Sequence, residues 1–229
     1  MVNLPACRTT SMVSRSARLF AALLVTLASA YGQNYDITPL FGGMFGGTVK
    51  LEQQGAPNIH ANLQDSFTFG VAGGIRIDAE DCEKCALIEF RWMRQDTHLG
   101  VAQDPLVVTP YGASATFRPS VTLDRYLGDF TYEFNQEDAP LIKPYIIASL
   151  GAVHISAPAS GATRFVFGLG TGIKIFPKPH WGFRLQVEYL PIVMQGAAQR
   201  IVCTTGCIVS LSGGLANQFE ATFGPVFRF

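Results

Sequence analysis

The sequence is poor in charge and has no excess of either sign. Charged residues make up 15% of the chain, and 17 basic residues balance 17 acidic ones. A chain without a basic field lacks the electrostatic footprint of a nucleic-acid-binding protein. At 48% hydrophobic residues it is also too apolar to be disordered. We therefore expect a folded protein without a nucleic-acid partner.

Long hydrophobic runs are also missing. A membrane-spanning helix needs about 18 or more apolar residues, and after residue 30 every such stretch is interrupted by a charge, a Gly or a Pro. Only helices and closed β-barrels satisfy all of their backbone polar groups in lipid. A hydrophobic chain of 229 residues without a spanning helix is therefore best interpreted as a membrane β-barrel.

Residues 1–30 have the features of a secretory signal peptide. Arg8, Arg15 and Arg18 stand in a region without acids, an apolar run follows over 19–27, and 28–30 reads Ala-Ser-Ala. A basic region, a short apolar region and small residues at the cleavage site define such a signal. We expect residues 1–30 to be removed and residues 31–229 to form one barrel domain.

The cysteines indicate an oxidising compartment. Of the 5 cysteines, Cys7 leaves with the signal peptide and the others form two close pairs, Cys82/Cys85 and Cys203/Cys207. Close pairs in exported proteins are usually local disulfides. The Cys-x-x-Cys at 82–85 also suits redox chemistry or zinc, but redox pairs open a helix and zinc requires a second pair nearby. We expect two disulfides, no metal and no cofactor.

The second pair also predicts a hairpin. It is flanked by two short apolar stretches, Ile201-Val202 and Ile208-Val209. This is the pattern of two strands joined by a tip that carries a cross-strand disulfide. We expect this hairpin to extend the last two segments of the chain outward.

Eight segments separated by turn chemistry make up the rest of the chain. Their approximate limits are 35–49, 66–78, 85–97, 121–134, 142–156, 163–176, 182–195 and 218–229. The connections at 50–65, 98–120, 157–162 and 196–217 are mostly long, whereas those at 79–84, 135–141 and 177–181 are short. Short turns at one end and longer loops at the other are typical of outer-membrane barrels.

The side chains of these segments alternate with the period of a β-strand. In segment 182–195, for example, Phe183 and Leu185 oppose Arg184 and Gln186. The non-apolar face is rich in glycine and its charges balance, which suits a narrow lumen crossed by ion pairs. Arg91 with Glu89 and Arg184 with Glu188 are examples of such pairs. The predicted lumen residues are Arg76, Glu89, Arg91, Asp129, Glu133, Lys174, Arg184, Glu188, Glu220 and Arg228.

Aromatic residues gather near the short-turn ends of the segments, as an interfacial girdle would. This predicted girdle comprises Tyr132, Phe134, Phe176, Trp181, Phe227 and Phe229. A solvated polar face with scattered aromatics is the alternative, because alternation by itself does not reveal which face is outside.

Together these features resemble the small eight-stranded outer-membrane barrels of the OmpA-type β-barrel family. The residues that carry the resemblance are the signal peptide, the eight alternating segments and the closing segment Phe219–Phe229. The resemblance implies a closed eight-stranded antiparallel up-and-down transmembrane β-barrel. It also implies that Phe223, Phe227 and Phe229 are read as an assembly signal by the barrel-assembly machinery. It covers the barrel domain only, because no periplasmic peptidoglycan-binding domain follows Phe229.

One pair of residues keeps an enzymatic alternative open. Some barrels that look like this one are lipid A deacylases with a His-x-Ser pair, and His154 and Ser156 share one face of a segment. The deacylase pair lies on the penultimate strand, where this chain reads Val-Glu-Tyr-Leu over 187–190. The acids left to orient His154 are the distant Glu133 and Asp129. His60, His98 and His180 lack partners at ligand spacing.

We expect a small integral protein of the bacterial outer membrane that is not an enzyme. Its role would be structural or one of surface recognition through the loops at 98–120 and 196–217, for a ligand that the sequence does not identify. Its surroundings would be outer-membrane lipid and lipopolysaccharide. The lipid A-modifying enzyme is the runner-up; a small channel or a soluble ligand-binding barrel comes after it, because eight strands enclose an interior that side chains fill.

Overall fold

The computed structural model describes residues 35–52, 59–77, 84–101, 120–134, 141–157, 160–194, 199–202, 208–212 and 214–229. The predicted signal peptide, Cys82, Cys203, Cys207, most of the loop 98–120 and part of the loop 196–217 lie outside these residues. The side chain of Cys85 is not described either. The disulfides and the export signal therefore stay predictions. No helix within the described ranges is long and apolar enough to cross a membrane.

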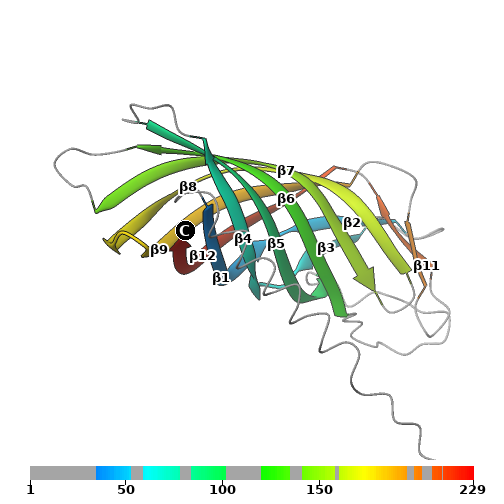
Figure 1. Ribbon diagram of the computed structural model, residues 1–229. Helices are drawn as coiled ribbons and strands as arrows, with labels where there is room; N and C mark the ends of the chain where they lie inside the picture. The colour runs from blue at the N-terminus through cyan, green and yellow to red at the C-terminus, as the bar shows by residue number, and fades with distance from the viewer. Residues whose placement is uncertain are drawn as a thin grey trace, which may run out of the picture.

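The described residues form β-strands, and each strand pairs with its neighbours in antiparallel orientation (Figure 1). The strands are β1 (Tyr35–Gly46), β2 (Thr48–Glu52), β3 (Ile59–Leu63), β4 (Ser66–Ile77), β5 (Lys84–Val101), β6 (Ser120–Phe134), β7 (Ile142–Ala157), β8 (Ser160–Lys178), β9 (Trp181–Val193), β10 (Gln199–Val202), β11 (Ile208–Ser212) and β12 (Leu215–Arg228).

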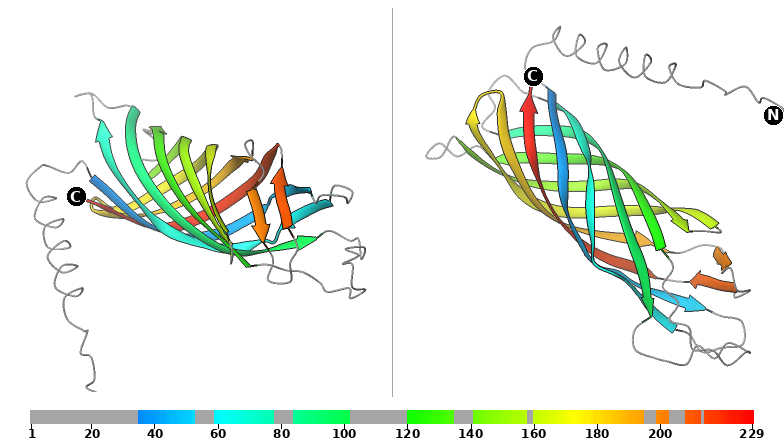
Figure 2. Two further views of the ribbon diagram at one scale, coloured as in Figure 1. Left: turned by 90° about the vertical axis from the view of Figure 1, so that its right-hand side faces the viewer. Right: turned by 90° about the horizontal axis from the view of Figure 1, so that it is seen from below.

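Eight of these strands close into a barrel. The wall runs β1-β4-β5-β6-β7-β8-β9-β12, and β12 pairs back onto β1. At the closure the backbone N–H of Tyr35 donates to the carbonyl of Phe229 at 3.1 Å, and the N–H of Phe229 donates back at 2.9 Å. The carboxyl end of the chain therefore lies beside the start of β1, and the strands are strongly inclined (Figure 2). The predicted eight-stranded antiparallel barrel is confirmed.

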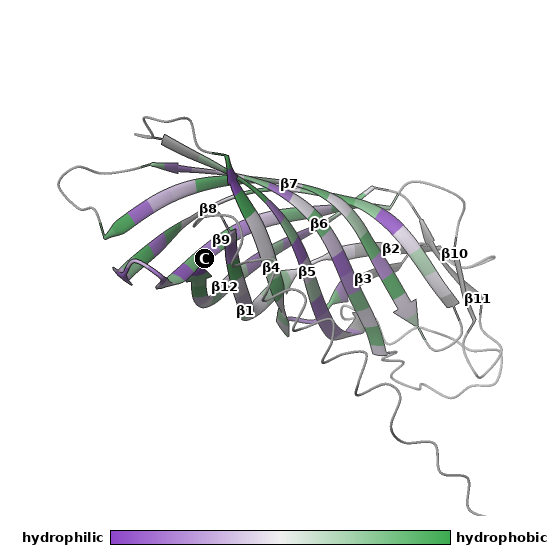
Figure 3. Ribbon diagram, viewed as in Figure 1, coloured by the Kyte–Doolittle hydropathy of each residue, from purple (hydrophilic) through white to green (hydrophobic). Residues whose placement is uncertain are grey.

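Large apolar side chains cover much of the outer face, and most of the predicted lumen charges are buried inside. Leu169 is 66% exposed and Phe67 60%, whereas Arg91 and Arg184 are 0% exposed. Along most strands the two kinds of residue alternate (Figure 3). This is the inverted arrangement that the glycine-rich, charge-balanced face predicted, and it is the opposite of a soluble barrel.

Glycines on the inner face make room for the large side chains of the lumen. A Cβ atom added at Gly172 would collide with the ring of Tyr145 and with the carbonyl of Leu185, and one at Gly168 would collide with the carboxylate of Glu188. The glycines of β8 are therefore needed for packing in a barrel of this small size.

The wall continues beyond the barrel at the end with the long connections. There β10, β11, β2 and β3 form a ribbon that joins the end of β5. The prediction of a loop over 50–65 is wrong in part, because β2 and β3 form a hairpin within it. The hairpin predicted around 203–207 is confirmed by the pairing of Ile201 with Val209 and of Val202 with Ile208.

Two further limits differ from the prediction, whereas the predicted connection 135–141 lies between the end of β6 and the start of β7 as expected. The predicted connection 157–162 is shorter, since β7 ends at Ala157 and β8 begins at Ser160. Likewise β5 runs on to Val101, beyond the predicted limit of its segment.

Bends separate the ribbon from the barrel at positions that only glycine occupies easily. Gly46 and Gly47 have φ angles of 78° and 112° between β1 and β2, and Gly214 has 101° before β12. Positive φ angles are costly for residues with a Cβ atom. The bend is stabilised by hydrogen bonds from the backbone N–H of Gly46 to Asp65 Oδ1 at 3.2 Å and from the N–H of Leu63 to the carbonyl of Gly47 at 2.7 Å.

The aromatic residues near the short turns lie on the outer face with one exception. Tyr132, Phe134, Trp181 and Phe227 point outward, and the ring pairs Tyr132–Phe134 and Trp181–Phe183 pack at centroid distances of 5.1 Å and 5.2 Å. The assignment of Phe176 to this girdle is wrong: its side chain is 6% exposed and lies inside. Phe176 is two residues from Lys174, so both point into the lumen.

A charge placed on the outer face should destabilise the barrel according to its depth. Leu169→Arg is expected to lower the free energy of unfolding by about 2–4 kcal/mol, because a cation near the bilayer centre is poorly solvated. Thr163→Arg, on the same face of β8 but close to its outer end, is the control and should cost under about 1 kcal/mol. Urea titration in lipid vesicles measures both costs. Equal costs would contradict the assignment of this face to lipid.

Candidate functional site

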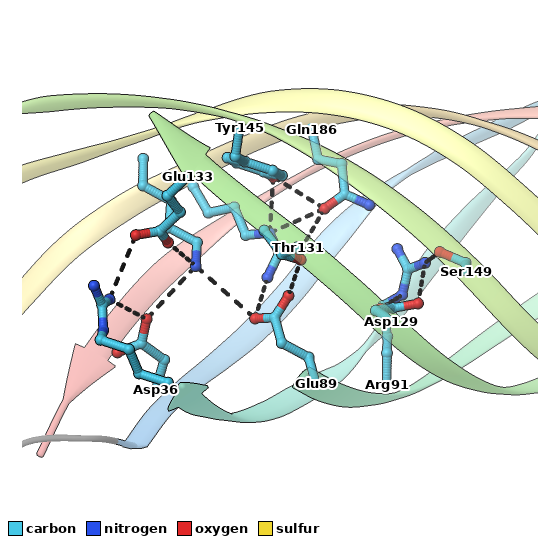
Figure 4. A network of polar contacts seen from close by, with 12 residues as sticks. Asp36, Glu89, Arg91, Asp129, Thr131, Glu133, Tyr145, Ser149 and Gln186 are labelled. Atoms are coloured by element: carbon cyan, nitrogen blue, oxygen red, sulfur yellow. Dashed lines mark hydrogen bonds and ion pairs between the residues drawn. The ribbon is translucent and has the colours of Figure 1, made fainter. Parts of the chain in front are cut away.

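The lumen contains a network of buried ion pairs. All ten predicted lumen residues take part in it, and their side chains are at most 13% exposed. They come from β4, β5, β6, β8, β9 and β12, so the network connects opposite walls of the barrel (Figure 4).

Two members of the network were missed by the sequence reasoning, Asp36 on β1 and Arg125 on β6. Asp36 is 2% exposed and Arg125 0%. The signal was present, because Arg125 has the same strand parity as Asp129 and Glu133. Since the two carry opposite charges, the network stays balanced, with six cations facing six carboxylates among the described residues.

Near the short-turn end, the network is centred on Asp36 and Glu133. Lys174 Nζ lies 2.6 Å from Glu133 Oε1 and 3.5 Å from Asp36 Oδ2. Arg76 bridges the same two carboxylates at 3.5 Å and 3.4 Å. Arg228 Nε donates to Asp36 Oδ1 at 3.0 Å, while its guanidinium stacks 4.0 Å above the ring of Phe176. The buried Phe176 therefore supports the cation at the closing strand.

The middle of the network is formed by Glu89 and Arg184. Arg184 Nη1 donates to Glu89 Oε1 at 2.8 Å, and the hydroxyl of Thr131 donates to Glu89 Oε2 at 2.8 Å. The other side of the Arg184 guanidinium donates to the Tyr145 hydroxyl and to Gln186 Oε1, both at 2.9 Å. Each polar group thus fixes the next, which favours one arrangement of the lumen.

The third part of the network is centred on Arg91. Its Nε lies 2.8 Å from Asp129 and its Nη2 lies 2.7 Å from Glu188, whose carboxylate also accepts a hydrogen bond from Ser149. Arg125 binds Glu220 at 3.2 Å beside it. The example pairs Arg91–Glu89 and Arg184–Glu188 are therefore wrong in their partners: Arg91 pairs with Glu188 and Arg184 with Glu89. The long arginine side chains reach carboxylates on other strands across the lumen. The spacing of residues along one strand does not reveal such partners.

Above the charges, toward the long connections, the lumen becomes apolar. Met44, Leu127, Leu190 and Ile192 are each at most 1% exposed and belong to one cluster. The cluster also contains Leu63, Val121, Leu123, Val153, Val166, Met194 and Ala216. The interior is thus filled by a charged layer and an apolar layer, as expected for eight strands.

The pair that kept the enzymatic alternative open, His154 and Ser156, lies on the outer face, away from this network. His154 is exposed near the outer end of β7, and its Nδ1 lies 3.1 Å from the Thr163 hydroxyl. Glu133 and Asp129 cannot orient it as the sequence suggested, because both point into the lumen. The acid that lies opposite His154 is Asp124 on β6, which the sequence reasoning missed.

Other candidate residues are scattered. His98 and His180 are exposed on separate parts of the surface. Nowhere in the described part of the chain do three His, Cys, Asp or Glu side chains come together as metal ligands. The predicted assembly residues Phe223, Phe227 and Phe229 are 56%, 41% and 46% exposed on the closing strand and its end.

These features define the chain as a small closed β-barrel with an apolar outer surface and a charged interior. It matches no protein-family model, and no curated protein resembles it in sequence. Among solved structures it is similar to the outer membrane protein OprG from Pseudomonas aeruginosa, with a TM-score of 0.57, 11% identity and coverage of 86% of this chain and 96% of that one.

It is also similar to Neisserial surface protein A, with a TM-score of 0.47, 14% identity and coverage of 85% and 96%. The likeness to OprG shows that this chain has the fold of a small outer-membrane barrel; the OmpA-type resemblance stays a prediction.

Removing a buried cation should destabilise the barrel strongly. Arg91→Met leaves Asp129 and Glu188 without their main partner and is expected to lower the free energy of unfolding by about 3–5 kcal/mol. Arg94→Met is the matched control: Arg94 lies on the same strand with a 41% exposed side chain and should contribute under about 1 kcal/mol. Urea unfolding in detergent micelles compares the two. Similar costs would show that the network does not stabilise the fold.

Proposed function

We propose that this chain is a small integral protein of the bacterial outer membrane, without catalytic activity, that acts at its outer end in a structural or recognition role. The observation that carries the proposal is the combination of an apolar outer surface with a lumen filled by paired charges. Such a surface suits lipid, and a closed ladder leaves few backbone groups unpaired within it.

The filled lumen directs the function to the outside. Arg91, Arg125 and Arg184 are fully buried, and the apolar cluster fills the interior above them. Passage of a solute would require several ion pairs to break at once, which is costly in a buried site. The ribbon of β2, β3, β10 and β11 extends the wall at the end opposite to Phe229, and β10 and β11 belong to the predicted recognition loop 196–217 (Figure 2).

The same proposal includes the route to the membrane. Export would use the signal peptide at residues 1–30, and the exposed rings of Phe223, Phe227 and Phe229 would be read by the barrel-assembly machinery. Lipid and lipopolysaccharide would surround the finished barrel. Arg94, Asp96 and Asp124 form a charged rim on the outer face, toward the ends of β5 and β6 that have the long connection, and this rim suits contact with lipopolysaccharide headgroups.

Cell fractionation combined with electrophoresis tests the proposal. The protein is expected in the outer-membrane fraction, and its unboiled form should run at a different mobility from the boiled form because the closed barrel resists detergent. A soluble periplasmic protein serves as the marker for cross-contamination. Recovery in the soluble periplasmic fraction without a mobility shift would refute a membrane barrel.

A lipid A-modifying enzyme is the second candidate, and one observation favours it. His154 and Ser156 lie on the outer face of β7, and Asp124 is the direct cross-strand neighbour of His154. A serine, a histidine and an acid on one surface near the outer leaflet are the groups that ester hydrolysis needs. In this structure Asp124 lies 3.8 Å from Arg94, and His154 contacts Thr163, so neither is engaged with Ser156.

Incubation of the folded protein with lipopolysaccharide separates the two candidates. We expect no release of fatty acid, because the three groups are not joined by hydrogen bonds. Release that is lost in Ser156→Ala and Asp124→Asn but kept in Thr122→Val would replace our proposal by the enzymatic one. Thr122 is the control because it lies opposite Ser156 on the same face.

A further inference from the structure

The line where the barrel closes, between β1 and β12, has an interrupted ladder. Pairing is present at Ile37–Phe227 and again at Phe41–Phe223, but the three positions of β1 between them are unpaired with β12. The same residues of β1 keep their pairing with β4 on the other side. The interruption therefore belongs to the seam and not to a bend of the strand.

Two prolines that face each other account for the interruption. Continuing the register from Ile37–Phe227 places Pro39 opposite Pro225. Tyr35 and Phe229 exchange both of their backbone hydrogen bonds. In an antiparallel ladder such pairs recur at every second residue, so 37/227 and 39/225 are positions of the same type. Proline has no N–H, so both donors of the 39/225 pair are missing.

Two other irregularities in the described wall are milder, and both lie between β8 and β9. One is a register shift between Ile175 and Lys178, near the turn. At the other, pairing is absent around Phe167 and Pro191. There only one of the two facing residues is a proline, so one donor remains. The seam is thus the place where the described wall loses both donors of one pair, and two carbonyl groups are left facing each other across it.

Side chains hold the seam on both sides of this interruption. On the side toward the short turns, Arg228 on β12 donates two hydrogen bonds to the carboxylate of Asp36 on β1, at 3.0 Å and 3.2 Å. On the side toward the long connections, the rings of Phe41 and Phe223 pack across the seam at a centroid distance of 6.3 Å. These two contacts bracket the proline pair, one inside the lumen and one on the outer surface.

From this geometry we infer that the β1–β12 seam is a built-in hinge line: the wall opens there first, around Pro39 and Pro225, and the Asp36–Arg228 ion pair is the latch that holds it. The inference goes beyond the proposed function, since it concerns how the barrel opens and closes whatever acts at its outer end. An opening at this position would expose the inner residues Thr38 and Val226 to the surroundings of the barrel.

Residue-resolved amide hydrogen exchange of the protein folded in detergent micelles tests the inference. The amides of Ile37 and Phe41 point across the seam, whereas those of Thr38 and Leu40 on the same strand point to β4. We expect the seam-facing amides to exchange at least about tenfold faster than the β4-facing ones. Equal protection of the two sets would overturn the inference, and this comparison requires no variant.

Restoring the donors should close the hinge. In the double variant Pro39→Val/Pro225→Val both N–H groups return, and exchange at Ile37 and Phe41 should slow by roughly tenfold or more. Pro191→Val is the control: it restores a donor between β8 and β9 and should leave exchange at the seam unchanged. Exchange that is unchanged in a folded double variant would refute the role of the prolines.

Removing the latch should have the opposite effect. Arg228→Met is expected to speed exchange at Ile37 and Phe41 while leaving the amides between β6 and β7 unchanged. Arg94→Met, which removes an arginine from the outer rim, is the matched control and should change neither set. A uniform rise in exchange over all strands in Arg228→Met would show that the ion pair stabilises the barrel as a whole and is no latch.

Discussion

The structure depends on the closure of the backbone ladder between the first and last strands. A strand with an unpaired edge cannot remain in apolar surroundings, because each unpaired backbone group costs several kcal/mol. The hydrogen bonds between Tyr35 and Phe229 complete the ring. Once the ring has eight strands, its interior is narrow, and the side chains that point inward must fill it.

The interior satisfies that constraint with charge. Six cations and six carboxylates face one another in the described lumen, and each buried charge has at least one partner of opposite sign within 4 Å. Arranged this way the charges tolerate burial, and they specify one packing of the strands against each other. The apolar cluster around Leu127 and Leu190 completes the filling toward the outer end.

The closure is also where the wall is weakest. Pro39 and Pro225 remove the backbone bonds of one pair, and the ion pair of Asp36 with Arg228 lies next to this gap. Asp36 has two further partners, Arg76 and Lys174, so the charge network and the seam are physically connected. A change in the lumen can therefore reach the wall at this line.

Local pattern alone determined most of the fold. The period of two in strands such as β9, together with the short turns near 79–84 and 177–181, predicted eight strands and their order. The inward face followed from glycine content and charge balance, because a lumen must be both narrow and neutral. Arg125 and Asp36 obey the same parity as their neighbours and were within reach of this reasoning. Phe176 was misplaced by its neighbourhood, although its parity with Lys174 indicated the lumen.

Contacts between distant strands were decided only by the tertiary structure. Whether Arg91 pairs with Glu89 or with Glu188 depends on which strands face each other across the lumen and on how far the guanidinium reaches. The spacing of residues along one strand specifies neither. The ribbon of β2, β3, β10 and β11 depends on the pairing of β2 with β11, which are about 160 residues apart in the sequence, and no local pattern encodes that pairing. The interruption of the ladder at Pro39 and Pro225 likewise depends on the register between β1 and β12. Only the closure of the barrel places these two prolines opposite each other.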